Sequence, residues 1–254
     1  MFAEERQKYI YDLLVTQQSV KVADLSSLLE TSEVTIRRDL DVLQSKKMVV
    51  RTHGGAILPY SVGRSVTSEE LMMHQVAEKQ AIAIQAYNLI DEYDTVLLDS
   101  SSTAFELYKL IIASHDKKLR IITTSLKILQ CVCDLTNITV MFVGGEVNVE
   151  HQTVEGYSAM RFIEQLRVDK CFLGINGIDQ DFGFSTPRFE DAEIKNQMIA
   201  SSVESFILAD HSKFGKVYLA HVDFCNCLIT DHLSNNIDFQ KFDEELRLIS
   251  VSEH

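Results

Sequence analysis

Apolar side chains in the first part of the chain recur at helical spacing and predict three short helices. These helices cover residues 4–16, 23–30 and 33–46. Ser32 is the expected N-cap of the third helix, because its hydroxyl can accept a hydrogen bond from an amide that lacks a partner at the helix start. Residues 48–52 and 56–58 flank the pair Gly54-Gly55 and predict the two strands of a hairpin wing.

Residues 59–65 lose this periodicity and contain one of the chain's two prolines, so they are the expected domain boundary. Beyond them, helical patterns alternate with short apolar runs that are typical of buried strands. The predicted helices cover residues 79–91, 104–112, 126–133, 158–165 and 190–201, and the predicted strands cover residues 96–99, 120–123, 139–143, 171–174, 206–209 and 228–230. This alternation predicts an α/β domain with a parallel sheet and helices on its faces.

The composition fits a folded protein inside the cell. The chain has 254 residues, of which 46% are hydrophobic, and this is enough for one large or two modest domains and excludes intrinsic disorder. No apolar run approaches the roughly 18 residues of a membrane span, and Glu4, Glu5 and Arg6 stand where a signal peptide needs apolar residues. We therefore expect a soluble, cytoplasmic protein without a membrane partner. With only ten glycines and two prolines, regular helices are expected to dominate over the many turns of an all-β fold.

Charge is distributed unevenly along the chain. Residues 1–56 carry eight basic and eight acidic side chains, and the rest of the chain carries the whole formal net charge of −13. We call residues 1–56 the head. A head without net charge, followed by an acidic remainder of the chain, is expected when only the head binds a polyanion.

The five cysteines are Cys131, Cys133, Cys171, Cys225 and Cys227. Disulfides are not expected, because the number is odd and no secretory signal is seen. In a strand, each Cys-x-Cys pair would place both thiols on one face, which leaves a metal site as one interpretation. The favoured interpretation is small apolar packing residues, since the spacing lacks the two-residue gap of zinc knuckles. We expect no metal and no cofactor.

The third predicted helix has two faces of different character. On an ideal helical wheel the apolar side chains fall within about 60° of one another, and they are Ile36, Leu40 and Leu43. The opposite half holds Val34, Arg37, Arg38, Asp41 and Ser45. Two guanidiniums near the short side chains of Ser32 and Thr35 suit a helix that enters the major groove, because Arg binds phosphates or guanine edges and small residues permit close approach. The alternative is a solvated helix with an Arg-Arg pair.

Two segments of the head resemble a known family. They are Ser32-Glu33-Val34-Thr35-Ile36-Arg37-Arg38-Asp39-Leu40 and Arg51-Thr52-His53-Gly54-Gly55-Ala56. Both resemble the signature of the DeoR family of bacterial transcription regulators, in which this region is a winged helix-turn-helix. The resemblance implies that Thr35, Arg37 and Arg38 approach DNA, and that Arg51 and His53 lie on or beside the wing.

Three polar segments follow predicted strands of the second domain. They are Asp99-Ser100-Ser101-Ser102-Thr103, Thr123-Thr124-Ser125 and Gly144-Gly145-Glu146. The carboxyl ends of parallel strands meet at one edge of a sheet, where open α/β sheets bind ligands. The first segment combines hydroxyls with the amides of a helix N-terminus, which suits an anion, and the glycines of the third allow a ligand close to the backbone. The alternative for each segment is simple turn capping.

The second domain resembles the sensor domain of the DeoR family, and with the head the similarity spans nearly the whole chain. Its motifs include Glu155-Gly156, Phe172-Leu173-Gly174, Asn176-Gly177-Ile178, Glu193-Ile194-Lys195 and the run from Leu208 to Gly215. That sensor is related to sugar-phosphate isomerases and deaminases and usually senses a phosphorylated sugar or a related metabolite. The resemblance implies that residues 100–103 hold the phosphate, and that Thr124, Gly145, Glu193 and Lys213 line the sugar side.

The sequence departs from the family pattern at four positions. Glu30 stands where the turn usually has Gly or Asn, and Lys21 stands where a capping Ser or Thr is common. Ser101 replaces the usual Gly of the phosphate loop, and Thr124 replaces a usual Asn. The last two leave open a regulator that has lost effector sensing.

An acidic domain needs local positive charge to bind a sugar phosphate, which carries a charge near −2. Lys213 is the candidate cation, together with helix N-termini. The alternative for Lys213 is a functionally silent ion pair with Asp210, three residues earlier. In that case Arg188 or Lys195 is the next candidate cation.

The predicted architecture is a winged helix-turn-helix in residues 1–58, a linker in residues 59–75, and a Rossmann-like α/β sensor in residues 76–254, related to sugar-phosphate isomerases. The predicted function is a DNA-binding transcription regulator, a repressor of a carbohydrate operon controlled by a phosphorylated sugar. The rival is a sugar-phosphate isomerase or deaminase using Asp99, Glu193, Asp210 and Lys213; the DNA-reading head argues against it. Operator DNA and the sugar are the expected partners, in a homodimer or tetramer.

Overall fold

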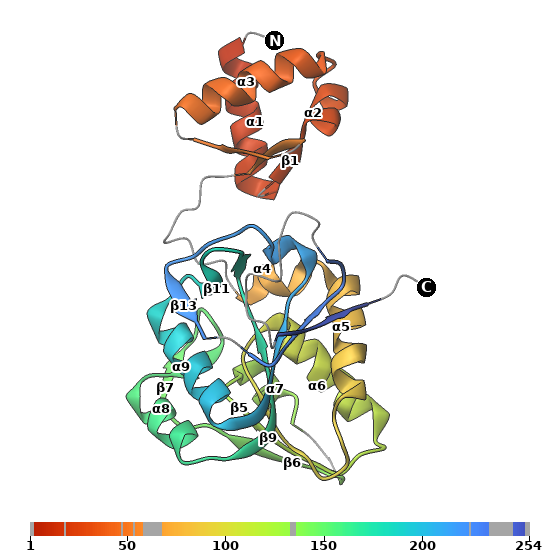
Figure 1. The fold of residues 1–254 in the computed structure, drawn as a ribbon, viewed down its shortest axis with the longest axis vertical. Helices are drawn as coiled ribbons and strands as arrows, with labels where there is room; N and C mark the ends of the chain where they lie inside the picture. The colour runs from red at the N-terminus through yellow and green to blue at the C-terminus, as the bar shows by residue number, and fades with distance from the viewer. Residues whose placement is uncertain are drawn as a thin grey trace. The chain divides into compact units, whose positions relative to one another are not determined.

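The fold is described from a computed structural model (Figure 1). It describes residues 3–17, 19–46, 48–52, 54–57, 68–132, 136–223, 225–233 and 246–251. Its contacts divide the chain into two compact units, Met1–Ser61 and Val62–His254. Residues 58–67, which include most of the predicted linker, lie outside the described residues, and residues 68–73 of that linker form a helix, α4 (Ser68–Met73).

Within its described residues, the first unit contains the three predicted helices and a small sheet. The helices are α1 (Ala3–Gln17), α2 (Val22–Leu28) and α3 (Glu33–Ser45), and the strands are β1 (Ser19–Lys21), β2 (Val50–Thr52) and β3 (Gly55–Ile57). The predicted wing hairpin of β2 and β3 is confirmed, but β1 adds a third antiparallel strand that the sequence did not predict. Gly55 permits this pairing, because a Cβ there would lie 1.8 Å from the carbonyl oxygen of Val20.

The apolar faces of the three helices form the core of the first unit. Its buried side chains include Ile10, Leu14, Leu25, Ile36, Leu40 and Leu43. The two departures from the family pattern that lie in this unit, Glu30 and Lys21, both affect the local structure. Glu30 adopts a left-handed φ of 47°, which Gly or Asn accepts at lower cost, and Lys21 precedes α2 without a side-chain capping bond.

A buried carboxylate joins α1 to α3. Asp39 is 4% exposed, and it accepts hydrogen bonds from Arg6 Nε at 2.5 Å and Gln7 Nε2 at 3.0 Å. The sequence motif gave Asp39 no role, because its partners lie more than thirty residues away on another helix. A buried ion pair of this kind holds the two helices in one geometry.

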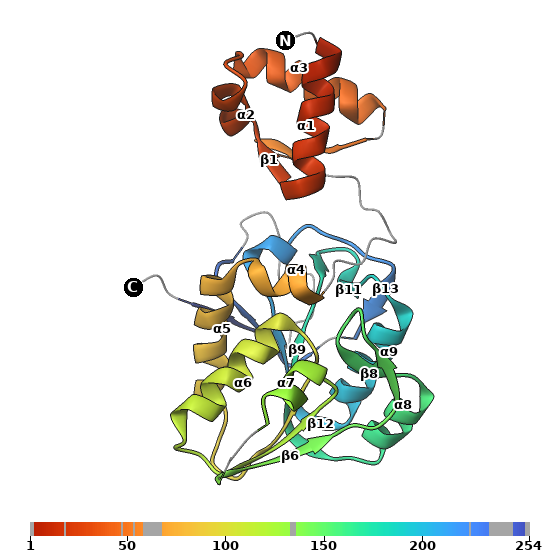
Figure 2. The same cartoon turned by 180° about the vertical axis from the view of Figure 1, so that it is seen from behind.

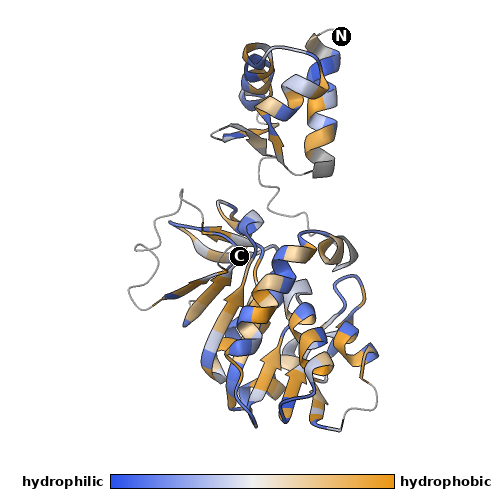
Figure 3. Ribbon diagram, turned by 90° about the vertical axis from the view of Figure 1, so that its right-hand side faces the viewer, coloured by the Kyte–Doolittle hydropathy of each residue, from blue (hydrophilic) through white to orange (hydrophobic). Residues whose placement is uncertain are grey.

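The described residues of the second unit form a seven-stranded parallel sheet in the order β15-β14-β12-β9-β4-β5-β6. The strands are β4 (Thr95–Leu98), β5 (Leu119–Thr123), β6 (Ile138–Phe142), β9 (Val168–Gly174), β12 (Ser202–Leu208), β14 (Cys227–Thr230) and β15 (Arg247–Ser250). The parallel sheet is the predicted one, with β15 added at one edge. Its strands carry the most hydrophobic colour in Figure 3.

Helices cover both faces of this sheet (Figures 1 and 2). Helices α5 (Val76–Asn88), α6 (Ser102–Ser114) and α7 (Leu126–Gln130) pack on one face, and α8 (Tyr157–Glu164) and α9 (Phe189–Ala200) pack on the other. Side chains alternate between the faces: Val96 and Leu98 join the first core, and Leu97 joins the second. The stacked rings of Phe172 and Phe206, 4.8 Å apart, tie the central strands together.

Several short elements at the edge of the sheet were not predicted. They are the hairpin of β7 (Glu146–Asn148) and β8 (Thr153–Glu155), and a small sheet of β10 (Gly177–Asp179), β11 (Gly183–Thr186) and β13 (Ala220–Val222). Unlike the apolar runs that predicted the strands of the large sheet, these segments mix apolar residues with polar ones or glycine. No helix in the described part of the chain is long and apolar enough to span a membrane.

The cysteines lie in apolar surroundings. Cys171, Cys225 and Cys227 are buried, and burial raises the pKa of Cys171 and of Cys225 to about 12. Cys133 lies outside the described residues. Among the residues that are described, no three His, Cys, Asp or Glu side chains form a group that could hold a metal ion.

We predict that Asp39→Ala lowers the free energy of unfolding of the first unit by about 3 kcal/mol, because it removes the buried carboxylate that pairs with the half-buried Arg6. Hydrogen exchange of peptides from α1 and α3 in the full chain measures this change. Asp24→Ala, which removes an exposed carboxylate, is the control and should change exchange little. Equal exchange in the two variants would contradict the role of Asp39.

Candidate functional sites

The exposed face of α3 carries the residues predicted to approach DNA. Ile36, Leu40 and Leu43 are buried, and the opposite half of the helix, including Arg37 and Arg38, is exposed. This confirms the two predicted faces. Val34 is 61% exposed at the N-terminal end, where a small apolar side chain leaves room for a ligand backbone.

Ser32 caps α3 as predicted. Its Oγ accepts a hydrogen bond from the Thr35 amide at 3.3 Å and lies 2.9 Å from Thr35 Oγ1. Arg37 pairs with Glu33 at 3.0 Å on the surface of the helix, whereas Arg38 makes no ion pair with any described residue. An exposed pair of this kind is weak, so both guanidiniums can be redirected to phosphates.

The wing is linked to α3 by Arg51. This residue lies on β2, and its Nε is 3.4 Å from Oδ1 of Asp41 on α3. The pairing positions the wing beside the helix. His53, which was predicted to lie on or beside the wing, is outside the described residues.

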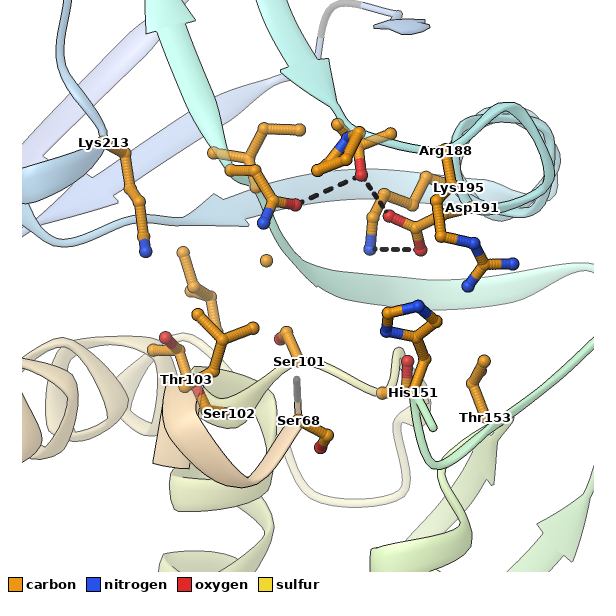
Figure 4. Close-up of a pocket in the computed structure, with 18 of the residues that line it drawn as sticks. Ser68, Ser101, Ser102, Thr103, His151, Thr153, Arg188, Asp191, Lys195 and Lys213 are labelled. Atoms are coloured by element: carbon orange, nitrogen blue, oxygen red, sulfur yellow. Dashed lines mark hydrogen bonds and ion pairs between the residues drawn. The ribbon is translucent and has the colours of Figure 1, made fainter. Parts of the chain in front are cut away.

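A pocket in the second unit lies at the carboxyl ends of β4, β9 and β12. Its lining includes Ser100, Ser101, Ser102 and Thr103 of the loop after β4, as well as Lys213. Ser102 and Thr103 begin α6, so their amides are at a helix N-terminus. Figure 4 shows Lys213 on the same side of the pocket as Ser102 and Thr103.

The carboxylate of Asp99 holds the backbone of this loop in place through hydrogen bonds. One carboxylate oxygen accepts a hydrogen bond from the Ser101 amide, and the other accepts from the Gly174 amide, both at 2.9 Å. The second oxygen also lies 2.6 Å from Lys195 Nζ. Asp99 is 2% exposed, so its role in the loop is to position the backbone.

Lys195 lies on α9 between two carboxylates. Besides Asp99 it contacts Asp191, one turn earlier, at 3.2 Å. Burial alone would lower the pKa of Lys195, but Asp191 and Asp99 hold it well above its ordinary value. The ammonium is therefore charged and already neutralised.

Ser101 fits the loop although the family usually has Gly there. Its hydroxyl accepts a hydrogen bond from the Ala104 amide at 3.2 Å and caps α6. The space for its side chain comes from Gly174 on β9, where a Cβ would lie 2.3 Å from Ser101 Cβ. One of the free amides of the helix start is thus used by the protein itself.

The other two predicted loops contribute less. Thr123 and Ser125 are buried: Thr123 Oγ1 accepts from the Ser125 amide at 3.0 Å, and Ser125 caps α7. Neither lines the pocket, while Thr124 lines a smaller adjoining pocket that also includes Asp99.

The glycine loop also lies outside the pocket. Gly144 is exposed, and Gly145 leaves room for Val154 and Ala159, because a Cβ there would lie 2.9 Å from side-chain atoms of each. The structure does not bring Gly144 and Gly145 to either pocket, and their approach to a ligand stays a prediction.

The structure does not bring Glu193 to the pocket either. Glu193 is exposed and lines neither pocket, whereas Asp191 and Lys195 on the same helix do. A helix turns by about 200° over two residues, so a side chain between these positions points the opposite way.

The lining also contains charged or titratable residues outside the predicted loops, among them Lys79, His151 and Arg188. Arg188 is held by Glu155 and lies 3.7 Å from Glu190. The sequence analysis named Arg188 only as an alternative cation to Lys213, placed Lys79 only at a helix start, and gave His151 no role.

Lysines surround Asp210 at one end of the pocket. Lys213 is 16% exposed and 3.8 Å from Asp210, which is 1% exposed, so this pair is not a surface pair. Lys79 Nζ donates to the carbonyl oxygens of Leu71 and His74. Burial and the nearby charge of Lys213 lower the pKa of Lys79 to about 8, and the same two causes lower that of Lys216 to about 8.

Asp210 is the carboxylate that balances these lysines. Burial alone would raise the pKa of Asp210, but Lys213, the hydrogen bonds with Ser212 and the charge of Lys79 hold it below its ordinary value. Glu106 and Glu78 also act on Lys79, but neither they nor Asp210 line the pocket. The lysines Lys79 and Lys213 do line it, which suits an anionic ligand.

Two family models match this chain. The DeoR-like helix-turn-helix domain matches residues 6–62, and the DeoR C-terminal sensor domain matches residues 74–232. The chain belongs to the DeoR family. It is thus a DNA-binding transcription regulator with a sensor domain, and the fold predicted from the sequence is confirmed.

Curated relatives match over most of their length. The regulator GolR of Listeria innocua is 31% identical over 100% of both chains. The repressor GlcR of Bacillus subtilis is 33% identical over 92% of this chain and 91% of its own. A putative aga operon repressor of Escherichia coli O157:H7 is 30% identical over 84% of this chain and 79% of its own.

Solved structures also resemble the fold. Ribose 5-phosphate isomerase A from Methanocaldococcus jannaschii has a TM-score of 0.39 at 16% identity, over 58% of this chain and 55% of that chain. The translation initiation factor eIF-2B of Pyrococcus horikoshii OT3 has a TM-score of 0.46 at 14% identity, over 87% of this chain and 70% of that chain. These likenesses describe the fold alone.

We predict that Gly174→Ala disturbs the loop after β4, because the added methyl would overlap Ser101. The expected loss of stability is about 1 to 3 kcal/mol, the usual cost of overpacking, with faster hydrogen exchange in residues 99–105. Gly144→Ala is the matched control, since no atom lies within 4 Å of a Cβ at that position. Unchanged exchange in the Gly174 variant would show that the loop does not depend on this contact.

Proposed function

We propose that the chain represses a carbohydrate operon and changes its DNA affinity when a phosphorylated sugar binds the sensor. The observation that carries this proposal is the pocket, in which the loop of residues 100–103 and Lys213 face one another. Relatives named as the transcriptional repressor GlcR and a putative aga operon transcriptional repressor support the repressor role.

On DNA, the exposed half of α3 is proposed to enter the major groove. Arg37 and Arg38 supply the cations, while Ser32 and Thr35 at the start of the helix allow close approach. Arg51 and His53 are proposed to add contacts from the wing. Residues 1–56 carry no formal net charge, so this segment adds no net electrostatic repulsion of its own toward DNA.

In the sensor, the sugar's phosphate is proposed to lie against the start of α6. The amides and hydroxyls of Ser102 and Thr103 would donate hydrogen bonds to its oxygens, and Lys213 would supply positive charge. Thr124, in the adjoining pocket, is proposed to face the sugar.

We infer binding without catalysis. Asp99 is enclosed by Ser101, Gly174 and Lys195, so it has no free position from which to take a proton from a sugar. As a bacterial-type DNA reader, the protein is proposed to act in the cytoplasm as a symmetric dimer or tetramer that matches paired half-sites.

We predict that replacing Arg37 and Arg38 together by Ala abolishes specific DNA binding and leaves the fold intact, because both side chains are exposed. In the unaltered protein, affinity should fall with salt at a log–log slope of about −0.9 for each phosphate neutralised. Fluorescence anisotropy with the chain's own upstream DNA measures both. Arg161→Ala, an exposed arginine of α8, is the control; an unchanged affinity in the double variant would remove the assignment of α3.

We predict that Lys213→Ala weakens the binding free energy of the sugar phosphate by about 1.5 to 3 kcal/mol, the range for a charge-assisted hydrogen bond. DNA affinity without the sugar should stay near the unaltered value, because Lys213 is not part of α3 or the wing. Calorimetric titration with the best-binding member of a sugar-phosphate panel measures the loss. Lys109→Ala removes an exposed lysine of α6 and is the control, and equal affinity in the two variants would assign the phosphate to another cation.

A further inference from the structure

The cations of the pocket fall into two groups with different partners. At one end, Lys79 donates to two backbone carbonyl oxygens and forms no ion pair with any described residue. Lys213 has a single carboxylate, Asp210, at 3.8 Å, and Lys216 lies close enough for its charge to be felt by both. Lys79 and Lys213 line this end of the pocket, and no described carboxylate lines it there. The carboxylates whose charges also act on Lys79, namely Asp210, Glu106 and Glu78, lie outside the lining, so the lining at this end is positive.

At the opposite end the balance is reversed. Lys195 lies between Asp99 and Asp191, and Arg188 is held by Glu155. Three carboxylates therefore face two cations, and Glu190 adds a fourth negative charge 3.7 Å from Arg188. The imidazole of His151 also lines this end; even a protonated His151 would leave no surplus of cations.

The two ends lie apart in the pocket. Figure 4 shows Lys213 above Ser102 and Thr103 on one side, and Arg188, Asp191 and Lys195 with His151 and Thr153 on the other. Ser101 lies between the two groups. A ligand that spans the pocket therefore meets positive potential at one end only.

We propose that the pocket selects a sugar with a single anionic group: a monophosphate whose far end carries uncharged hydroxyls. It discriminates against sugar bisphosphates and phosphorylated sugar acids. This inference rests on the proposed function and names the charge pattern of the ligand.

Hydroxyls suit the far end because they both donate and accept. A sugar hydroxyl can donate to Glu155 or Asp191 and accept from Arg188, whereas a second phosphate or a carboxylate can only accept. The second anion would also face carboxylates in a partly buried site, where like charges repel more strongly than in water. Arg188 and Lys195 cannot offset this cost without giving up their present partners.

The test is calorimetric titration of the full chain with matched pairs of ligands. The pairs are ribose 5-phosphate with ribose 1,5-bisphosphate, fructose 6-phosphate with fructose 1,6-bisphosphate, and glucose 6-phosphate with 6-phosphogluconate. Within each pair for which binding is detected, we expect the ligand with one anionic group to bind at least about tenfold more tightly than the doubly anionic ligand. This ratio corresponds to about 1.4 kcal/mol.

Asp191→Asn tests the cause, because it removes one far-end charge without changing the shape of the side chain. It should narrow the ratio within a pair by about threefold or more. Glu193→Gln removes a carboxylate from the same helix, outside the pocket, and should leave the ratio unchanged. The ratio is a better measure than either affinity alone, since a general disturbance of the fold would weaken both ligands together.

The outcomes separate this inference from the proposed function. Equal or tighter binding of the doubly anionic ligand would overturn the charge selection and leave sugar-phosphate sensing in place. The protein could instead prefer the singly anionic ligand tenfold, with the same ratio in the Asp191→Asn and Glu193→Gln variants. That result would overturn the assignment of the preference to the far-end carboxylates. If no ligand of any pair binds, both the inference and the proposed sensing function are wrong.

Discussion

The pocket of the sensor depends on the buried ion pair between Asp99 and Lys195. The two charged groups are 2.6 Å apart and almost fully shielded from solvent. Because Asp99 also fixes the amides of Ser101 and Gly174, one carboxylate joins the end of β4, the end of β9 and helix α9. Such a pair adds little net stability compared with apolar packing, but losing one partner leaves an uncompensated charge, so the geometry is strongly enforced.

This pair also determines where the pocket is positive. Lys195 and Arg188 are neutralised by neighbours, so the charge available to a ligand comes from Lys213 and Lys79, beside the start of α6. The part of the chain after residue 56 carries the whole net charge of −13, and an anion is stabilised there only where cations and helix amides converge. The head differs: its arginines lie on an exposed helix face, where they can meet a phosphate backbone.

The sequence predicted the elements that pack through repeated apolar positions, such as the buried face of α3 with Ile36 and Leu40. It did not predict β1, a three-residue strand whose pairing depends on a single close approach at Gly55. In the sensor, the spacing of apolar residues predicted a helix over 190–201, but it did not predict which face of this helix lines the pocket. The resemblance pointed to Glu193, whereas the pocket contains Asp191 and Lys195, because neighbouring strands and loops decide which side is covered.

A sugar phosphate in the sensor pocket and DNA on α3 are proposed to shift the same conformational equilibrium of the protein. Their coupling is reciprocal: the factor by which the sugar phosphate changes operator affinity must equal the factor by which the operator changes sugar-phosphate affinity. The direct measurement titrates the full chain with its own upstream DNA at several concentrations of a sugar monophosphate, and then titrates the sugar with and without DNA. We expect equal factors of about 5- to 150-fold. An operator affinity that does not change at saturating sugar monophosphate would contradict this coupling.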